Sequence, residues 1–154
     1  MPTTLCLLRH ARATGQGPDA ALVPEGEEYV RGLGRRLAAT GFAPARAYCS
    51  PYRRARETAR IVLAEVAPGM TAVQLPELTP DHDAGDTLDV LRALELPAAR
   101  VLLVSHLPLL GLLAQNLTNE VVAFSPGMLA EIEMNAAWDA GRIARIHGPD
   151  GAAG

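Results

Sequence analysis

Short apolar runs that end abruptly at polar residues constrain the fold of this chain more than any other feature. The runs at residues 3–8 and 100–104 each end at a polar residue followed by a histidine, His10 and His106. Their length and their polar ends are typical of buried strands in a sheet. We therefore predict two buried strands that stop where the polar side chains begin.

Helical patterns lie between the strands. Pro24 suits a first helical position, and apolar side chains follow it at helical spacing until Gly41. Strands that alternate with helices are typical of an α/β sheet covered on both faces. We predict a three-layer sandwich with a mostly parallel central sheet. The other expected elements are helices at 52–66, 86–95 and 107–117, strands at 45–49 and 71–75, and an antiparallel or edge strand at 128–134 that pairs with 142–147.

Composition limits what such a chain does. Of its 154 residues 49% are hydrophobic and 20% are charged, and the net charge is −3. These values favour one domain with a real core and argue against a nucleic-acid binder held by bulk charge. Cys6 and Cys49 lie in apolar strands and are expected to be buried thiols. No apolar stretch reaches the roughly 18–20 residues of a membrane span and no secretion signal is evident, so we expect a cytoplasmic protein without membrane contact.

Polar residues gather at the carboxyl ends of three predicted strands: Arg9 and His10, then Arg54, then His106. Ligands of open α/β sheets bind at these ends, so we expect the side chains to share a pocket. Arginine forks and helix N-termini match phosphate oxygens, which predicts a phosphate site. His10 is the better nucleophile candidate, because it is held by both flanks and a neutral ring nitrogen can take a phosphoryl group. Arg9, Arg54 and a protonated His106 would stabilise the charge on that group.

Three ordered motifs resemble the histidine phosphatase (phosphoglycerate mutase-like) superfamily. LRHA at 8–11 is similar to its Arg-His-Gly signature, SPYRRARETA at 50–59 to its second arginine motif, and VSHLP at 104–108 to its second histidine motif. The resemblance implies a phosphoglycerate mutase-like fold. It spans roughly residues 3–135. Because the sequence contains no repeat or linker, we expect one histidine phosphatase domain at 1–147, followed by a terminal tail at 148–154 that is expected to be frayed.

A narrower resemblance points to the bacterial phosphohistidine phosphatases of the SixA type. It rests on PELTP at 76–80, on SHLPL at 105–109 and on the small size without a lid insertion. The superfamily resemblance implies that His10 is phosphorylated during turnover and that no metal or other cofactor is required. Its phosphoryl-binding residues correspond here to Arg9, Arg54 and His106.

The signature departs from the superfamily pattern at Ala11, where a glycine is usual. A methyl group is tolerated there if the backbone keeps a negative φ. Arg12 follows and is expected at the pocket rim, in contact with substrate. We also expect Ser50 to cap the helix that follows it.

The segment after the third strand offers Glu77 and Asp81 as possible general acids, but neither lies in a clear acid motif. An alkoxide leaving from a sugar phosphate needs a proton, whereas an imidazole leaving from phosphohistidine is a better leaving group. This contrast favours phosphohistidine in a histidine-containing phosphotransfer domain as the substrate. The alternatives are a phosphatase or mutase for a small phosphate ester, such as a sugar phosphate, and a non-catalytic phosphate-binding module.

Overall fold

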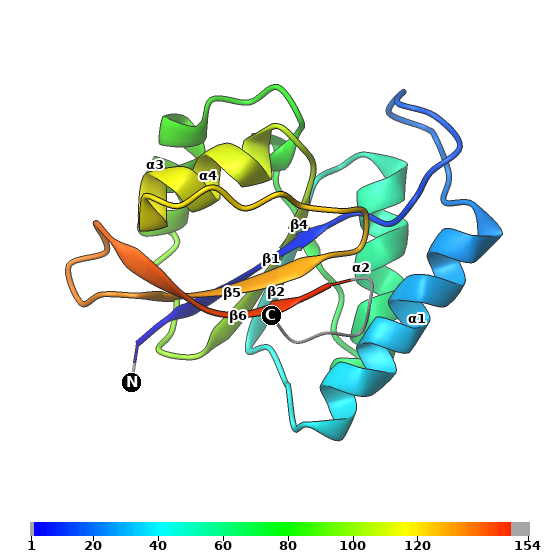
Figure 1. The fold of residues 1–154 in the computed structure, drawn as a ribbon, viewed down its shortest axis with the longest axis horizontal. Coiled ribbons are helices and arrows are strands. Elements are labelled where there is room, and N and C mark those ends of the chain that lie inside the picture. The colour runs from blue at the N-terminus through cyan, green and yellow to red at the C-terminus, as the bar shows by residue number, and fades with distance from the viewer. Residues whose placement is uncertain (1, 149–154) are drawn as a thin grey trace.

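The computed structural model describes residues 2–148, in which a six-stranded sheet lies between two pairs of helices (Figure 1). Along the sheet the strands follow the order β3-β2-β4-β1-β5-β6. All of the expected tail except Gly148 lies outside the described residues. The strands are β1 (Thr4–Arg9), β2 (Arg46–Cys49), β3 (Val73–Gln74), β4 (Arg100–Ser105), β5 (Leu129–Met134) and β6 (Gly141–His147).

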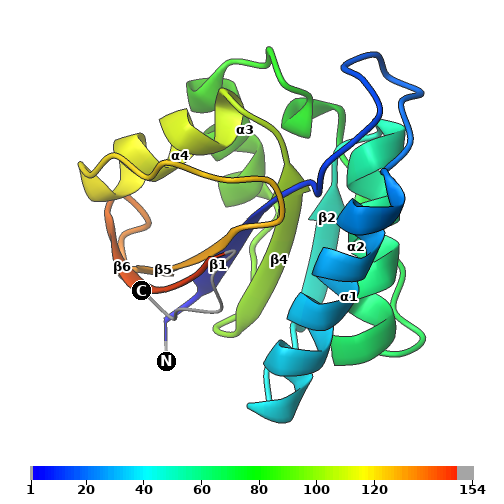
Figure 2. The same cartoon turned by 45° about the vertical axis from the view of Figure 1, so that its right-hand side comes forward.

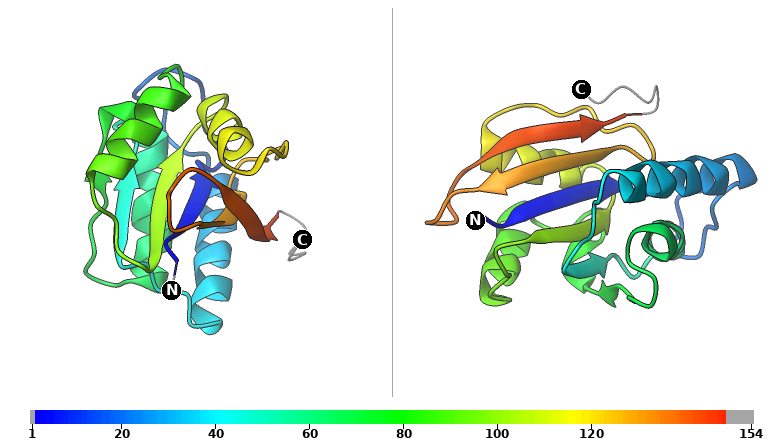
Figure 3. Two further views of the ribbon diagram at one scale, coloured as in Figure 1. Left: turned by 90° about the vertical axis from the view of Figure 1, so that its left-hand side faces the viewer. Right: turned by 90° about the horizontal axis from the view of Figure 1, so that it is seen from below.

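The sheet is mostly parallel, as predicted. β1 pairs in parallel with β4, and β2 pairs in parallel with both β4 and β3. β5 runs antiparallel to β1 and to β6, and the strands can be followed side by side from below in Figure 3. The expected hairpin of β5 and β6 is therefore confirmed, and of the two strands it is β6 that lies at the edge.

Helices cover both faces of the sheet, which confirms the three-layer α/β fold (Figure 2). Side chains alternate across a strand, so Leu5 and Leu7 of β1 pack on the α3 and α4 side, whereas Cys6 and Leu8 pack on the α1 and α2 side. All four are fully buried, which explains why this strand is continuously apolar. The helices are α1 (Pro24–Ala39), α2 (Arg53–Val66), α3 (Ala84–Ala93) and α4 (Leu109–Thr118), with a 3-10 turn, η1, at Pro76–Leu78.

Three elements differ by two residues at one or both ends from the sequence-based boundaries, and most of the others differ by one residue. β3 has two residues where 71–75 was expected, because only Val73 and Gln74 pair with β2. α3 begins at Ala84, since the Asp83 side chain accepts the N–H of Asp86 and caps the helix there. α4 begins at Leu109 rather than at residue 107, because a residue before proline is disfavoured in helical conformation.

Candidate active site

The structure brings together the four residues predicted to form the phosphate site. Arg9 ends β1 and His10 follows it, Arg54 lies in the first turn of α2, and His106 follows β4. All four line a cavity of about 590 Å³ at the carboxyl ends of the parallel strands. The pairing of β1 with β4 sets the two histidine rings 5.1 Å apart, centroid to centroid.

His10 is held by a hydrogen bond that determines which ring nitrogen carries the proton. Its Nδ1 lies 2.7 Å from the carbonyl oxygen of Ala11. A carbonyl only accepts, so Nδ1 is the donor and the neutral ring keeps its lone pair on Nε2. Nε of Arg54 donates a hydrogen bond to that Nε2 at 3.3 Å. The nitrogen that carries the lone pair therefore faces a guanidinium group.

Both histidines are neutral at neutral pH. Burial, together with the charges of Arg54 and Arg9, lowers the pKa of His10 to about 4, although the bond to Ala11 opposes the shift. Burial first, and then His10 and the two arginines, lower the pKa of His106 to about 3. Burial first, and the neighbouring cations second, therefore disfavour a protonated His106 in the unliganded protein, and its protonation beside a bound phosphoryl group stays a prediction.

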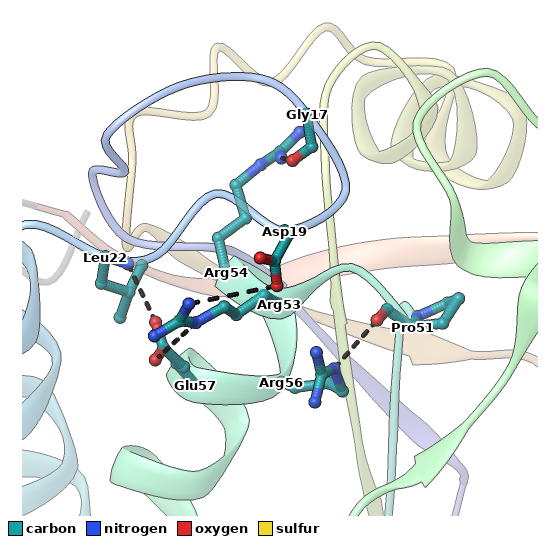
Figure 4. Close-up of polar contacts among 8 residues, drawn as sticks. All are labelled: Gly17, Asp19, Leu22, Pro51, Arg53, Arg54, Arg56 and Glu57. Carbon is teal, nitrogen blue, oxygen red and sulfur yellow. Dashed lines mark hydrogen bonds and ion pairs between the residues drawn. The ribbon is translucent and has the colours of Figure 1, made fainter.

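Of the three arginines at the start of α2, Arg54 alone lines the cavity, and its side chain reaches Gly17 in the loop before α1 (Figure 4). Its Nη1 donates to the carbonyl oxygens of Gln16 and Gly17 at 3.1 and 2.8 Å. Arg53 instead pairs with two carboxylates, Glu57 on the next turn of the helix and Asp19 in the loop. Arg56 likewise turns away, and its Nε donates to the carbonyl of Pro51.

Arg9 and Arg54 carry positive charge that no carboxylate of the described residues neutralises. Within residues 2–148 neither side chain forms an ion pair. Nη1 of Arg9 donates to the carbonyl of Phe124 at 2.9 Å, while its buried Nε has no partner among these residues. Burial lowers the pKa of both guanidinium groups, and Arg54 lowers that of Arg9 further, but such groups stay charged near neutrality. The site is therefore complementary to an oxyanion.

The loop before β5 closes one side of the site. The backbone N–H of Gly127 donates to the carbonyls of Arg9 and His10, both at 3.1 Å. Gly127 has a φ of 78°, and a Cβ there would lie 2.6 Å from the ring of Tyr29. Only glycine combines this positive φ with the absence of a Cβ. Gly127 therefore fixes the loop that carries Pro126 to the cavity wall.

Two residues beside His106 have contacts that the sequence did not reveal. Ser50 was expected to cap α2, but Tyr52 holds the N-cap position, and no side chain caps that end. Oγ of Ser50 instead lies 2.8 Å from Nε2 of His106. The Tyr52 ring meets His106 edge-on at 5.1 Å, and the guanidinium carbon of Arg54 lies 5.1 Å from the same ring. The one sequence signal for these ring contacts was the tyrosine directly before Arg53 and Arg54.

Of the three other residues predicted to take part in the site, two line the cavity and one does not. Arg12 and Asp81 are exposed and line the cavity, whereas Glu77 is not among its lining residues. Of the described residues that line the cavity, Asp81 is the one carboxylate. Ala11 is buried, and its φ lies outside the positive region, so the methyl group is tolerated as expected.

Within residues 2–148, no group of three or more histidine, cysteine, aspartate or glutamate side chains is placed to hold a metal ion. In the same part of the chain, no helix combines the length and the apolar character needed to cross a membrane. The two cysteines are buried and free, as predicted.

Comparison with known proteins identifies the class to which this fold and site belong. Residues 5–86 match the model of the histidine phosphatase superfamily (branch 1), so the chain belongs to that superfamily. The family match and the structural likeness below support phosphatase activity. A search of curated protein sequences gives no match.

Solved structures share the fold over nearly the whole chain. The protein histidine phosphatase SixA complexed with tungstate is 27% identical, with a TM-score of 0.87 over 96% of this chain and 97% of that one. A putative phosphohistidine phosphatase SixA from Agrobacterium tumefaciens is 20% identical, with a TM-score of 0.81 over 97% and 99%. A mycobacterial glucosyl-3-phosphoglycerate phosphatase is 15% identical, with a TM-score of 0.74 over 92% and 96%. The last two likenesses concern the fold alone.

Proposed function

We propose that this chain is a cytoplasmic protein phosphohistidine phosphatase that works through a phosphohistidine intermediate on His10, in one domain at residues 1–147. The observation that carries the proposal is the bond from Nδ1 of His10 to the Ala11 carbonyl. That bond leaves Nε2 unprotonated beside Arg54 in a cavity with uncompensated positive charge. A neutral imidazole nitrogen in this setting is a competent nucleophile toward a phosphoryl group.

In the first step, the lone pair on Nε2 of His10 forms a bond to phosphorus, and the phosphorus–nitrogen bond of the substrate breaks. The electron pair of that bond stays on the substrate ring, which leaves as neutral imidazole when its second nitrogen already carries a proton. Nδ1 of His10 keeps its proton and donates it in a hydrogen bond to the Ala11 carbonyl. This bond stabilises the positive charge of the phosphorylated ring. Arg9, Arg54 and His106 hold the phosphoryl oxygens, and Arg12 contacts the rest of the substrate.

In the second step, water attacks the same phosphorus atom and the bond to Nε2 breaks. The electron pair returns to Nε2, and the protons of the water remain with phosphate and solvent. No metal or other cofactor enters either step.

The cavity wall supports a substrate with a good leaving group. Asp81 lies exposed at the rim, and Glu77 is not among the lining residues. A phosphohistidine side chain requires no strong acid, because its leaving group is an imidazole rather than an alkoxide. The likeness to SixA with tungstate, an oxyanion of phosphate-like shape, agrees with this substrate class. The partner we propose is a phosphorylated histidine-containing phosphotransfer domain.

The direct test is phosphate release from such a phosphorylated domain. We expect His10→Ala to lower the rate by at least about 10³-fold, because the nucleophile is lost. His82→Ala, a histidine outside the cavity lining, serves as the matched control and should leave the rate unchanged. Rapid quenching of the wild type should trap acid-labile label on His10. Equal rates for His10→Ala and the wild type would contradict the mechanism.

A second candidate is hydrolysis of a small phosphate ester, and the position of Asp81 in the cavity wall favours it. A carboxylic acid there could protonate an alkoxide leaving group. Asp81→Asn should then slow ester turnover strongly and phosphohistidine turnover little. Robust turnover of sugar phosphates, with none on the phosphorylated protein, would replace the first proposal by this one. Anion binding without any trapped label would instead indicate a non-catalytic binding module.

A further inference from the structure

Ser50 and His106 form a buried pair that joins two strand ends. Ser50 follows β2 and is fully buried, and 1% of His106 is exposed. Oγ of Ser50 accepts the backbone N–H of Tyr52 at 3.1 Å and lies 2.8 Å from Nε2 of His106. The backbone bond fixes the position of the hydroxyl oxygen, and the pairing of β2 with β4 brings the imidazole to it.

The direction of the bond between these side chains follows from the number of protons available. A serine hydroxyl has one proton to donate and can accept as well. The N–H of Tyr52 already donates to the oxygen, so the oxygen needs no second donor. Among the described residues, Nε2 of His106 is the acceptor within reach of the hydroxyl proton. An unbonded hydroxyl proton at a fully buried site would cost the free energy of a lost hydrogen bond.

We propose that Ser50 is a positioning residue, whose hydroxyl donates to Nε2 of His106 and so holds the neutral ring with its proton on Nδ1. Nδ1 is buried and has no partner among residues 2–148, while His106 lines the cavity. With this proton in place, a neutral His106 donates a hydrogen bond to a phosphoryl oxygen. In the other tautomer a bare lone pair would meet the anion and repel it.

The two histidines then use the same tautomer for opposite purposes. In His10 the Ala11 carbonyl accepts the Nδ1 proton in a hydrogen bond, so the lone pair lies on Nε2, the attacking nitrogen. In His106 the Ser50 hydroxyl occupies Nε2 and leaves the Nδ1 proton free to bind. Because both rings are neutral at neutral pH, these partners decide which ring is nucleophile and which is donor. The use of His106 against a phosphoryl group rests on the proposed function, whereas the tautomer does not.

The tautomer can be observed directly. In protein labelled with nitrogen-15 histidine, two-bond proton–nitrogen correlation spectra at pH 7 distinguish a protonated from a bare ring nitrogen. His106→Asn identifies the His106 signals by their loss. We expect a protonated Nδ1 and a bare Nε2 for His106 in the wild type. A proton on Nε2 would overturn the proposal without any need for a Ser50 variant.

Substitution tests the role of the hydroxyl. Ser50→Ala should shift the His106 ring toward the Nε2-protonated form and weaken tungstate binding about tenfold, the effect of one lost hydrogen bond. Ser105→Ala is the matched control. Its hydroxyl is equally buried but donates to the Leu78 carbonyl, so the His106 tautomer should not change. An unchanged tautomer and unchanged tungstate affinity in Ser50→Ala would overturn the proposal. Failure of the proposed function would appear separately, as absent turnover in the wild type.

Discussion

The active-site cluster of Arg9, His10, Arg54 and His106 contrasts with a second buried polar group, the Glu131 cluster. Glu131 on β5 is 4% exposed, and its two carboxylate oxygens lie 2.9 Å from Nε of Arg100 and 2.9 Å from Nε2 of His147. Burial alone would raise the pKa of this carboxyl, but the bonds from His147 and Arg100 lower it. Each buried oxygen of the Glu131 cluster thus has a partner within the chain.

The active-site cluster keeps its charge without such partners. The buried guanidinium group of Arg54, the half-buried one of Arg9 and two neutral imidazoles lie together there, and no carboxylate of residues 2–148 forms an ion pair with either arginine. Charge neutralised inside the chain contributes to folding, whereas charge left without a partner is available to a bound anion. The contrast predicts that substitutions in the active-site cluster lower the rate of turnover, whereas substitutions in the Glu131 cluster lower the free energy of unfolding.

The largest effect is expected from Arg54→Met. Removal of a guanidinium group that holds the transferred phosphoryl group should lower kcat about 10³-fold, equivalent to ~4 kcal/mol of transition-state stabilisation. Steady-state phosphate release measures it. Arg100→Met, which removes an arginine of the Glu131 cluster, should leave kcat close to the wild-type value. Equal losses in the two variants would remove the distinction between the clusters.

Glu131→Ala should act on stability instead. The change leaves Arg100 and His147 without their carboxylate, and we expect the free energy of unfolding to fall by about 3 kcal/mol. Urea unfolding followed by circular dichroism measures this value. The folded variant should retain wild-type kcat. A fall in kcat with unchanged stability would contradict the structural role.

The pH dependence of stability separates the clusters further. The pKa values of His10 and His106 are lowered by folding, so below about pH 6.5 the unfolded chain binds protons that the folded protein does not. The free energy of unfolding should therefore fall between pH 7 and pH 5, by about 2 kcal/mol for each ring.

The Glu131 carboxyl should not lower the free energy of unfolding between pH 7 and pH 5. Because its pKa is lowered in the folded protein, the stability that it contributes is lost only as the pH falls below the ordinary pKa of a glutamate. His106→Asn should remove roughly half of the pH dependence, measured as urea unfolding at the two pH values. An unchanged slope in that variant would show that the active-site histidines are not its origin.

The smallest effect is stabilisation by an anion. Tungstate at ten times its Kd should raise the free energy of unfolding by about 1.4 kcal/mol and Tm by a few degrees. The gain should persist in Glu131→Ala and disappear in Arg54→Met. Thermal unfolding with and without tungstate measures it, and an equal gain in both variants would place the anion outside the active-site cluster.

The order of strands and helices and the convergence of Arg9, His10, Arg54 and His106 could be predicted from the sequence. Apolar runs and helical spacing are local properties, and parallel strands place their carboxyl ends at the same edge. The short β3 could not be predicted, because the length of an edge strand depends on how much of it finds a partner. The partner of Ser50 was also missed, because a serine before a helix more often caps it.

The sequence by itself determined the α/β order and the residues able to form a phosphate site, since both follow from side-chain type and spacing. The tertiary structure alone decided the protonation of that site. Ser50 and His106 lie 56 positions apart and meet only because β2 pairs with β4. The pKa of each histidine depends on burial and on cations from other elements, which no local pattern encodes. Which ring attacks and which ring donates is therefore a property of the folded chain.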